Sequence, residues 1–100
     1  MGVFAVVTAK GQNWDHSRDV RNQPYWTEHA AFADGLVANG TILLGGPVST
    51  EDDDVIALLA VQAADEHELR SVLAADPWTT YRVFRFKAIW PWTLWLDGRR

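Results

Sequence analysis

The chain has 100 residues, a length typical of one compact domain, and we expect a single domain over residues 1–100. Nine Lys and Arg against 13 Asp and Glu give a net charge of −4, which argues against nucleic-acid binding because that function needs a basic surface. Hydrophobic residues make up 48% of the chain, which excludes intrinsic disorder, and the lack of cysteine excludes disulfides, thiol nucleophiles and thiolate metal sites.

The first half of the sequence predicts a strand, a long loop and a helix. Residues 3–9 form a short apolar run rich in β-branched side chains, which is typical of a strand. Residues 10–22 are polar and unpatterned, and they predict a loop of a length that is often functional. Pro24 suits the first turn of a helix. From Trp26 onward apolar side chains recur at three- and four-residue spacing, until Gly40 ends the helix.

The middle of the chain predicts two strands and a second helix. Residues 41–44 indicate a strand that ends at the Gly-Gly-Pro of residues 45–47, and residues 55–61 indicate a third strand with almost no polar side chain. A helix is expected over residues 66–75. It ends before Pro77, because the residue that precedes a proline avoids the α region.

Residues 79–90 predict the longest strand, which ends at Pro91. The resulting order is β-α-β-β-α-β. This order indicates the ferredoxin-like α+β fold, an antiparallel sheet with both helices on one face.

Both faces of the predicted sheet are apolar, although two helices can cover only one of them. In residues 3–9 the side chains of Val3, Ala5 and Val7 alternate with those of Phe4 and Val6, and residues 55–61 show the same pattern. A sheet with one solvated face would carry a polar row instead. We therefore expect a homodimer in which the open sheet faces pack against each other.

Tryptophan is in surplus for so small a chain, with six residues in all. Trp90, Trp92 and Trp95 crowd the C-terminal end, and we assign them to the open face and the dimer. In the alternative, residues 91–96 fold back across the face of their own protomer. The two arrangements are compatible with each other.

His29 and Asp76 are the strongest candidates for chemistry. His29 lies on the apolar side of the first predicted helix, where a histidine needs a hydrogen-bond partner. Asp76 lies at the C-terminal end of the second predicted helix, where the helix dipole disfavours an acid. A carboxylate that accepts from one imidazole nitrogen raises the basicity of the other. The alternatives are a satisfied core histidine and an Asp-Pro turn that bonds its own backbone.

Other classes of site have little support in the sequence. The four acids at residues 51–54 lack the spacing of a calcium loop, and an exposed acidic turn is the better interpretation. No metal-ligand or nucleotide motif is present, so we expect neither a metal nor a cofactor. No run approaches the ~18 apolar residues of a membrane span, and the N-terminus lacks the basic region of a signal peptide. We expect a cytoplasmic protein that does not bind a membrane.

Several short segments match a known family in their order and spacing. They are the strand at residues 4–7, the segment NGTILLGGP at residues 39–47, the turn ADPW at residues 75–78, and the Pro-Trp pair at residues 91–92. Together with a helix that bears His29, these segments resemble the YCII-related (YciI-like) domain family over nearly the whole chain.

The resemblance implies a ferredoxin-like fold, sheet-to-sheet dimers in a dimeric α/β-barrel-like assembly, and a His–Asp pair that maps onto His29 and Asp76. The family is similar to muconolactone-type dehalogenases and isomerases. Many relatives carry an Arg three residues before the histidine, where this chain has Trp26. An anion contact is therefore either lost here or supplied by Arg18 or Arg21.

Two hypotheses follow for function. In the first, the protein is a small-molecule enzyme in which His29 is the general acid/base and Asp76 orients it. In the second, it is a non-catalytic dimeric domain that binds a small hydrophobic or aromatic ligand. The expected ligand-contacting residues are Trp26, Trp78, Arg21, Gly46 and Pro47, with Trp14 as a further candidate for the pocket wall.

Overall fold

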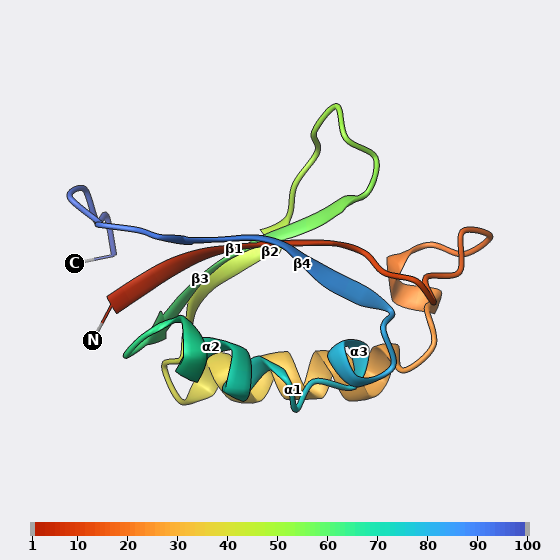
Figure 1. Ribbon diagram of the computed structural model, residues 1–100, viewed down its shortest axis with the longest axis horizontal. Helices are drawn as coiled ribbons and strands as arrows, with labels where there is room; N and C mark the ends of the chain where they lie inside the picture. The colour runs from red at the N-terminus through yellow and green to blue at the C-terminus, as the bar shows by residue number, and fades with distance from the viewer. Residues whose placement is uncertain (1, 100) are drawn as a thin grey trace.

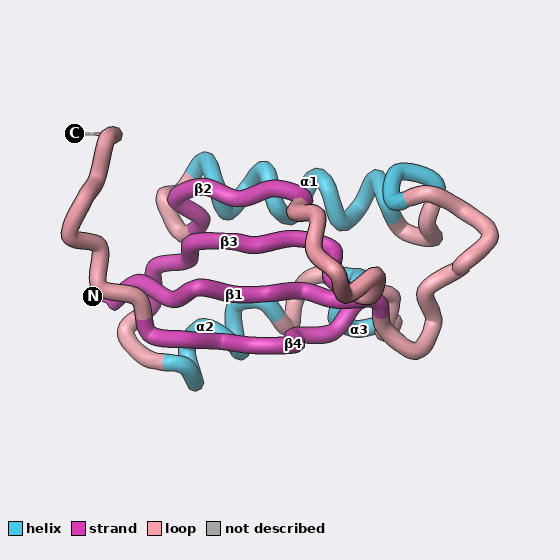
Figure 2. Tube along the Cα trace, turned by 90° about the horizontal axis from the view of Figure 1, so that it is seen from above, coloured by secondary structure: helices cyan, strands magenta, loops and turns pink. Residues whose placement is uncertain are grey.

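The computed structural model describes residues 2–99, which form a four-stranded antiparallel sheet with helices beneath one face (Figure 1). The elements in chain order are β1 (Gly2–Lys10), the 3-10 turn η1 (Val20–Asn22), α1 (Trp26–Ala38), β2 (Ile42–Pro47), β3 (Val55–Ala63), α2 (Glu66–Leu73), α3 (Pro77–Thr80) and β4 (Phe84–Pro91). The strand order is β2-β3-β1-β4, seen face-on in Figure 2. The predicted ferredoxin-like plan is confirmed.

The core lies between the sheet and the helices. β1 is central because it pairs with β3 on one side and β4 on the other. Its alternate side chains Phe4 and Val6 point toward the helices and are buried. They pack in one cluster with Leu36 of α1 and with Leu69 and Leu73 of α2. The alternate side chains of β1 and the regularly spaced apolar side chains of α1 and α2 therefore form one apolar layer.

Helix α1 begins at Trp26, two residues later than the proline that was expected to open it. Tyr25 has a φ of 63°, in the left-handed region that a helix excludes, so residues 24 and 25 form a turn. The helix stops as predicted, because Gly40 has a φ of 84° and accepts a conformation that other residues avoid.

The predicted strand over residues 79–90 is wrong in its first part. Residues Pro77–Thr80 form the short helix α3, and β4 starts at Phe84. A local hydrogen bond explains the difference, because the side chain of Asp76 caps α3 by accepting from the amide of Trp78. The proline in the first turn further favours a helix start, which the apolar pattern of this region conceals.

Strand β2 is longer than predicted. It continues through residues 45–47, which pair with β3 instead of ending the strand. A Cβ atom at Gly45 would lie 2.4 Å from a side-chain carbon of Leu59 and 3.1 Å from the carbonyl oxygen of Leu58. Glycine at this position therefore permits a close approach to β3 and does not break the strand.

The sheet face opposite the helices carries exposed apolar side chains, as the alternation predicts. Leu44 is 53% exposed and Trp90 57% exposed. A shallow cavity of about 310 Å³ on this outer face is lined by Ala5, Leu58 and Trp90 together with Pro91 and Trp92. This surface remains uncovered in one protomer.

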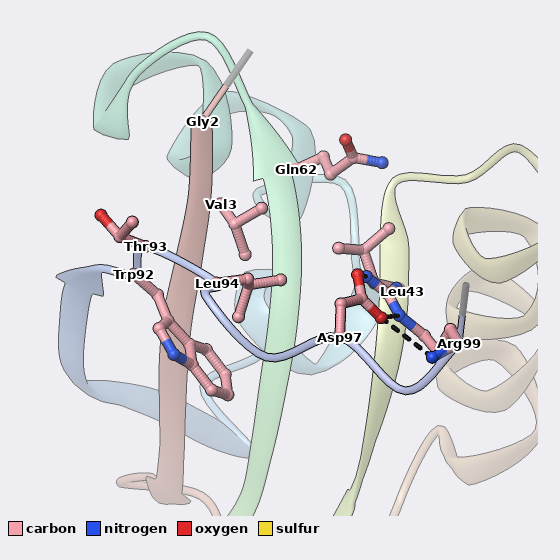
Figure 3. Close-up of a pocket in the computed structure, with 9 residues that line it drawn as sticks. All are labelled: Gly2, Val3, Leu43, Gln62, Trp92, Thr93, Leu94, Asp97 and Arg99. Atoms are coloured by element: carbon pink, nitrogen blue, oxygen red, sulfur yellow. Dashed lines mark hydrogen bonds and ion pairs between the residues drawn. The ribbon is translucent and has the colours of Figure 1, made fainter.

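The C-terminal tail does cross part of the outer face of its own protomer. The amide of Trp92 donates to the carbonyl oxygen of Val3 at 2.8 Å. After Trp92, an open cavity of about 630 Å³ lies between the tail and the sheet. Its lining includes Val3, Leu43 and Leu94 (Figure 3). Trp95 is almost fully exposed. The tail therefore covers one end of the face and leaves Trp90 in the open.

The acidic turn between β2 and β3 stands on the side of the sheet away from the helices (Figure 1). Lys87 of β4 forms an ion pair with Asp52, and Arg85 lies 3.9 Å from Asp54. Basic side chains of β4 thus neutralise part of the negative charge of this turn. Within residues 2–99, no group of three or more His, Asp or Glu side chains is arranged to hold a metal ion. No helix of this described part is long and apolar enough to span a membrane.

Candidate active site

The fold brings His29 and Asp76 into direct contact, although 47 positions separate them in the sequence. Nδ1 of His29 lies 2.7 Å from Oδ2 of Asp76. The His29 side chain is 17% exposed and that of Asp76 is 5% exposed. Helix α1 supplies the imidazole, and the turn between α2 and α3 supplies the carboxylate. A buried carboxylate at this distance from a ring nitrogen forms a strong hydrogen bond.

Asp76 is fixed from two sides. One oxygen accepts from His29, and the other accepts from the backbone amide of Trp78 at 2.9 Å. The same side chain therefore caps α3 and holds the imidazole. Asp76 therefore makes both of the contacts considered from the sequence, the bond to the backbone of its own turn and the bond to His29, because each oxygen makes one of them.

The contact with Asp76 also selects the tautomer of His29. A carboxylate oxygen only accepts, so Nδ1 must carry the proton and donate it. In the neutral imidazole Nε2 then keeps a lone pair, and no hydrogen bond joins it to another of residues 2–99. The imidazole thus presents an unengaged basic nitrogen.

Trp78 holds the plane of the imidazole. Its ring stacks on that of His29 with centroids 3.9 Å apart and an interplanar angle of 3°. The indole is itself fixed, because it is buried and its Nε1–H donates to the carbonyl oxygen of Pro24 at 2.8 Å. Trp14 meets the edge of Trp78 at 5.8 Å, and Trp26 lies 5.7 Å from the His29 ring. The histidine is therefore locked in orientation by aromatic packing and by Asp76 together.

The long loop before α1 is held in shape by the buried side chain of Gln23. Its Nε2 donates to the carbonyl oxygens of Asp15 at 2.7 Å and Arg18 at 3.0 Å, and its Oε1 accepts from the amide of Asp15 at 2.8 Å. Hydrogen bonds from the hydroxyl and amide of Ser17 lower the pKa of Asp15 below its ordinary value. This bonding orders the loop internally, and Trp14 of the same loop packs in the aromatic cluster with Trp78.

A cavity of about 90 Å³, open to solvent, lies between α1 and the sheet beside the His–Asp pair. Three of its lining residues are polar, namely Thr8, His29 and Asp76. The remaining lining residues are apolar or aromatic: Phe32, Ala33, Leu36, Ile42, Ile56, Ala57, Leu59, Leu73, Trp78, Phe84 and Phe86. Low polarity around few polar groups strengthens their electrostatic interactions.

The other ligand-contacting residues expected from the sequence are scattered. Trp78 lines the cavity, whereas Trp26 contacts the His29 ring without lining it. Arg21 is exposed in η1. Gly46 and Pro47 lie on the edge strand β2, outside the lining of this cavity. The structure thus gathers the histidine, the aspartate and one tryptophan.

Two polar residues of this region, Thr8 and Gln23, were not predicted from the sequence. Thr8 interrupts an apolar strand with a hydroxyl, and that interruption was the available signal. Gln23 precedes a proline at the end of a polar loop and carries no pattern that distinguishes it from exposed neighbours. Its role depends on contacts with carbonyl groups several residues away, which sequence spacing does not reveal.

Comparison with known proteins agrees with the fold and identifies the family. The family model of the YCII-related domain matches residues 3–93. No curated protein sequence matches the chain. Among solved structures, the chain is similar to 5-chloro-2-hydroxyhydroquinone dehydrochlorinase (TftG) from Burkholderia phenoliruptrix AC1100 in complex with 2,5-dihydroxybenzoquinone. Sequence identity is 25%, the TM-score is 0.58, and the alignment covers 97% of this chain and 96% of that chain. Because the family model spans nearly the whole sequence, the chain belongs to the YCII-related domain family.

Proposed function

We propose that this protein is a small-molecule enzyme in which His29 is the general acid/base and Asp76 is its positioning residue. The observation that carries the proposal is the 2.7 Å contact between Nδ1 and Oδ2, which leaves Nε2 with a free lone pair. A base oriented by a carboxylate and set in a mostly apolar cavity is the arrangement that proton transfer needs.

Elimination of a leaving group, or an isomerisation, suits a site with one base. Nε2 of His29 takes a proton from a hydroxyl group, or from a carbon beside a carbonyl. The electrons of that bond form a new double bond. In an elimination from a halogenated hydroquinone, His29 returns this proton to the ring carbon that bears the halide, and the halide then leaves with its bonding pair as a second hydroxyl group gives its proton to the same nitrogen. In an isomerisation, the same nitrogen returns the proton to another atom of the substrate.

The cavity limits the substrate to about the size of one ring. A closed cavity of roughly 150 Å³ is known to accept benzene, whereas this open cavity holds about 90 Å³. A single ring therefore enters in part, or with a shift of the lining side chains. The similarity to a dehydrochlorinase bound to a dihydroxybenzoquinone supports a hydroxylated ring that loses halide.

The test is chloride release from 5-chloro-2-hydroxyhydroquinone, followed together with the absorbance of the quinone product. His29→Gln is expected to lower the rate about a hundredfold or more, the usual contribution of a positioned general base. His67→Gln is the matched control, because this histidine is exposed on α2. A wild-type rate in His29→Gln would show that the imidazole is not the base.

A second candidate is ligand binding without catalysis, as in a dimeric accessory domain. The packing of His29 favours it, because a histidine that is bonded to Asp76 and stacked on Trp78 is already satisfied as a core residue and needs no catalytic role. Under this function the wild-type protein and His29→Gln bind 2,5-dihydroxybenzoquinone, and neither releases chloride from the chlorinated ring.

The uncovered outer face supports a homodimer. Leu44 and Trp90 are more than half exposed there, and a large exposed apolar patch is typical of an interface. A stable interface buries about 800 Å² on each partner. Sedimentation velocity is expected to give a dimer that Trp90→Glu dissociates. Val37→Glu, an exposed position on α1, is the control that keeps the dimer. A monomeric wild-type mass at micromolar concentration would exclude it.

A further inference from the structure

Thr8 is a buried polar residue that neither the core nor the His–Asp pair explains. It is 1% exposed and lies on the central strand β1. Its side chain lines the same cavity as His29 and Asp76, and it is the polar lining residue that comes from the sheet. The cavity therefore has a polar group on its sheet side as well as on its helix side.

The hydroxyl of Thr8 is weakly engaged. Its Oγ1 donates to the carbonyl oxygen of Ala57 at 3.5 Å, the long limit for a hydrogen bond. The other buried polar side chains make closer contacts, with Asp76 at 2.7 and 2.9 Å and Gln23 at 2.7 and 2.8 Å. A hydroxyl offers one donor and two lone pairs. Thr8 thus keeps most of its hydrogen-bonding capacity for a molecule in the cavity.

Both ladders of β1 change register at this residue. The pairing with β4 shifts between Val7 and Thr8, and the pairing with β3 shifts between Thr8 and Ala9. Such irregularities redirect a side chain and are frequent beside functional sites. Valine has the same shape and suits an apolar strand equally well. The sheet itself therefore gives no reason for a hydroxyl at this point.

We propose that Thr8 is a ligand-positioning residue whose hydroxyl bonds a polar substituent of the bound ring. Nε2 of His29 then transfers the reacting proton on the helix side of the cavity. The proposal rests on the proposed function for the existence of the ligand site, and it is independent of the particular reaction. It assigns to the ligand a single ring with two polar positions, one facing α1 and one facing β1.

The experiment compares phenol with toluene, two rings of similar size that differ by a hydroxyl group. Their dissociation constants are measured by NMR titration, with the indole Nε1–H signal of Trp78 as the reporter. Thr8→Val is expected to weaken phenol binding about fivefold, the usual worth of one hydrogen bond, and to leave toluene binding unchanged. Thr8→Ser restores the preference for phenol. The urea midpoint of Thr8→Val is expected to equal or exceed that of the wild type.

Equal effects on the two rings, or no effect on either, would overturn the role of Thr8. A fall in the urea midpoint of Thr8→Val together with unchanged phenol binding would assign the hydroxyl to the fold instead. If phenol binding is unchanged while His29→Gln still abolishes turnover, the proposed function stands without Thr8. If the wild-type protein binds neither ring, the ligand site is wrong, and both proposals fail.

Discussion

Replacement of Asp76 separates its two roles, because asparagine and alanine remove different bonds. Asparagine keeps an oxygen that can cap α3 through the amide of Trp78, and it is as good a cap as aspartate. Its amide nitrogen, however, must then face Nδ1 of His29, and two donors cannot bond each other. The imidazole is expected to move its proton to Nε2, so that Nδ1 accepts.

The magnitudes follow from the contacts. Asp76→Asn exchanges a charge-assisted hydrogen bond for a neutral one, at a cost of about 1 kcal/mol in the free energy of unfolding. Asp76→Ala loses the cap, worth about 1 kcal/mol, and leaves the Nδ1–H of His29 without its partner, worth about 1–3 kcal/mol more. We expect about 2–4 kcal/mol for alanine, a large share of the 5–15 kcal/mol typical of a domain.

Two measurements check this reasoning. Nitrogen-15 chemical shifts of the imidazole report the tautomer, with the proton on Nδ1 in the wild type and on Nε2 in Asp76→Asn. Urea unfolding gives the two stability changes. The asparagine variant is also expected to lose turnover, because Nε2 no longer has a lone pair. An unchanged tautomer in Asp76→Asn, or a cost for Asp76→Ala no greater than that of a lost cap, would refute the coupled pair.

Three further outcomes are expected. Trp78→Leu removes the stack on His29 and the bond to Pro24, and should cost about 3 kcal/mol in urea unfolding and broaden the imidazole signals; sharp, unshifted signals would contradict this. Gln23→Ala removes the buried side-chain amide that bonds the loop carbonyl oxygens. Backbone amide hydrogens of the loop before α1 should then exchange faster, while those of β1 stay protected. The lowered pKa of Asp15 means that its contribution to stability is present above the ordinary aspartate pKa and is lost as the pH falls through the lowered value. Acid should therefore loosen the turn at Ser17, as measured by amide exchange, and Asp15→Asn should remove the dependence.

The order of strands and helices was predictable because it follows from the periodic spacing of apolar side chains. The alternation in β1 and the spacing in α1 each express burial on one side, and burial on one side is what the sheet and the helices require. The start of β4 was not predictable in this way. The aromatic residues after Pro77 resemble a strand in composition, and a single side-chain bond from Asp76 makes them helical.

The same limit applies to the site. His29 stood out because a polar residue on an apolar helix face needs a partner, and the unfavourable position of Asp76 made it a candidate for that partner. Sequence spacing alone could not show the contact. Thr8 offered only a hydroxyl in an apolar strand, and Gln23 offered no signal. Their surroundings depend on a register shift in β1 and on the contacts of Gln23 with the carbonyl oxygens of residues 15, 18 and 19. Pairwise chemistry can be inferred from residue types, whereas the positions of backbone atoms depend on the assembled fold.

The two groups of tryptophan lie on opposite sides of one sheet, which separates the proposed catalytic site from the proposed dimer surface. Trp78 stacks on His29 on the helix side, and Trp90 is exposed on the outer face. Both sides are built on β1, whose alternate residues Thr8 and Ala5 line the cavity and the outer face respectively. A partner on the outer face therefore need not touch the cavity.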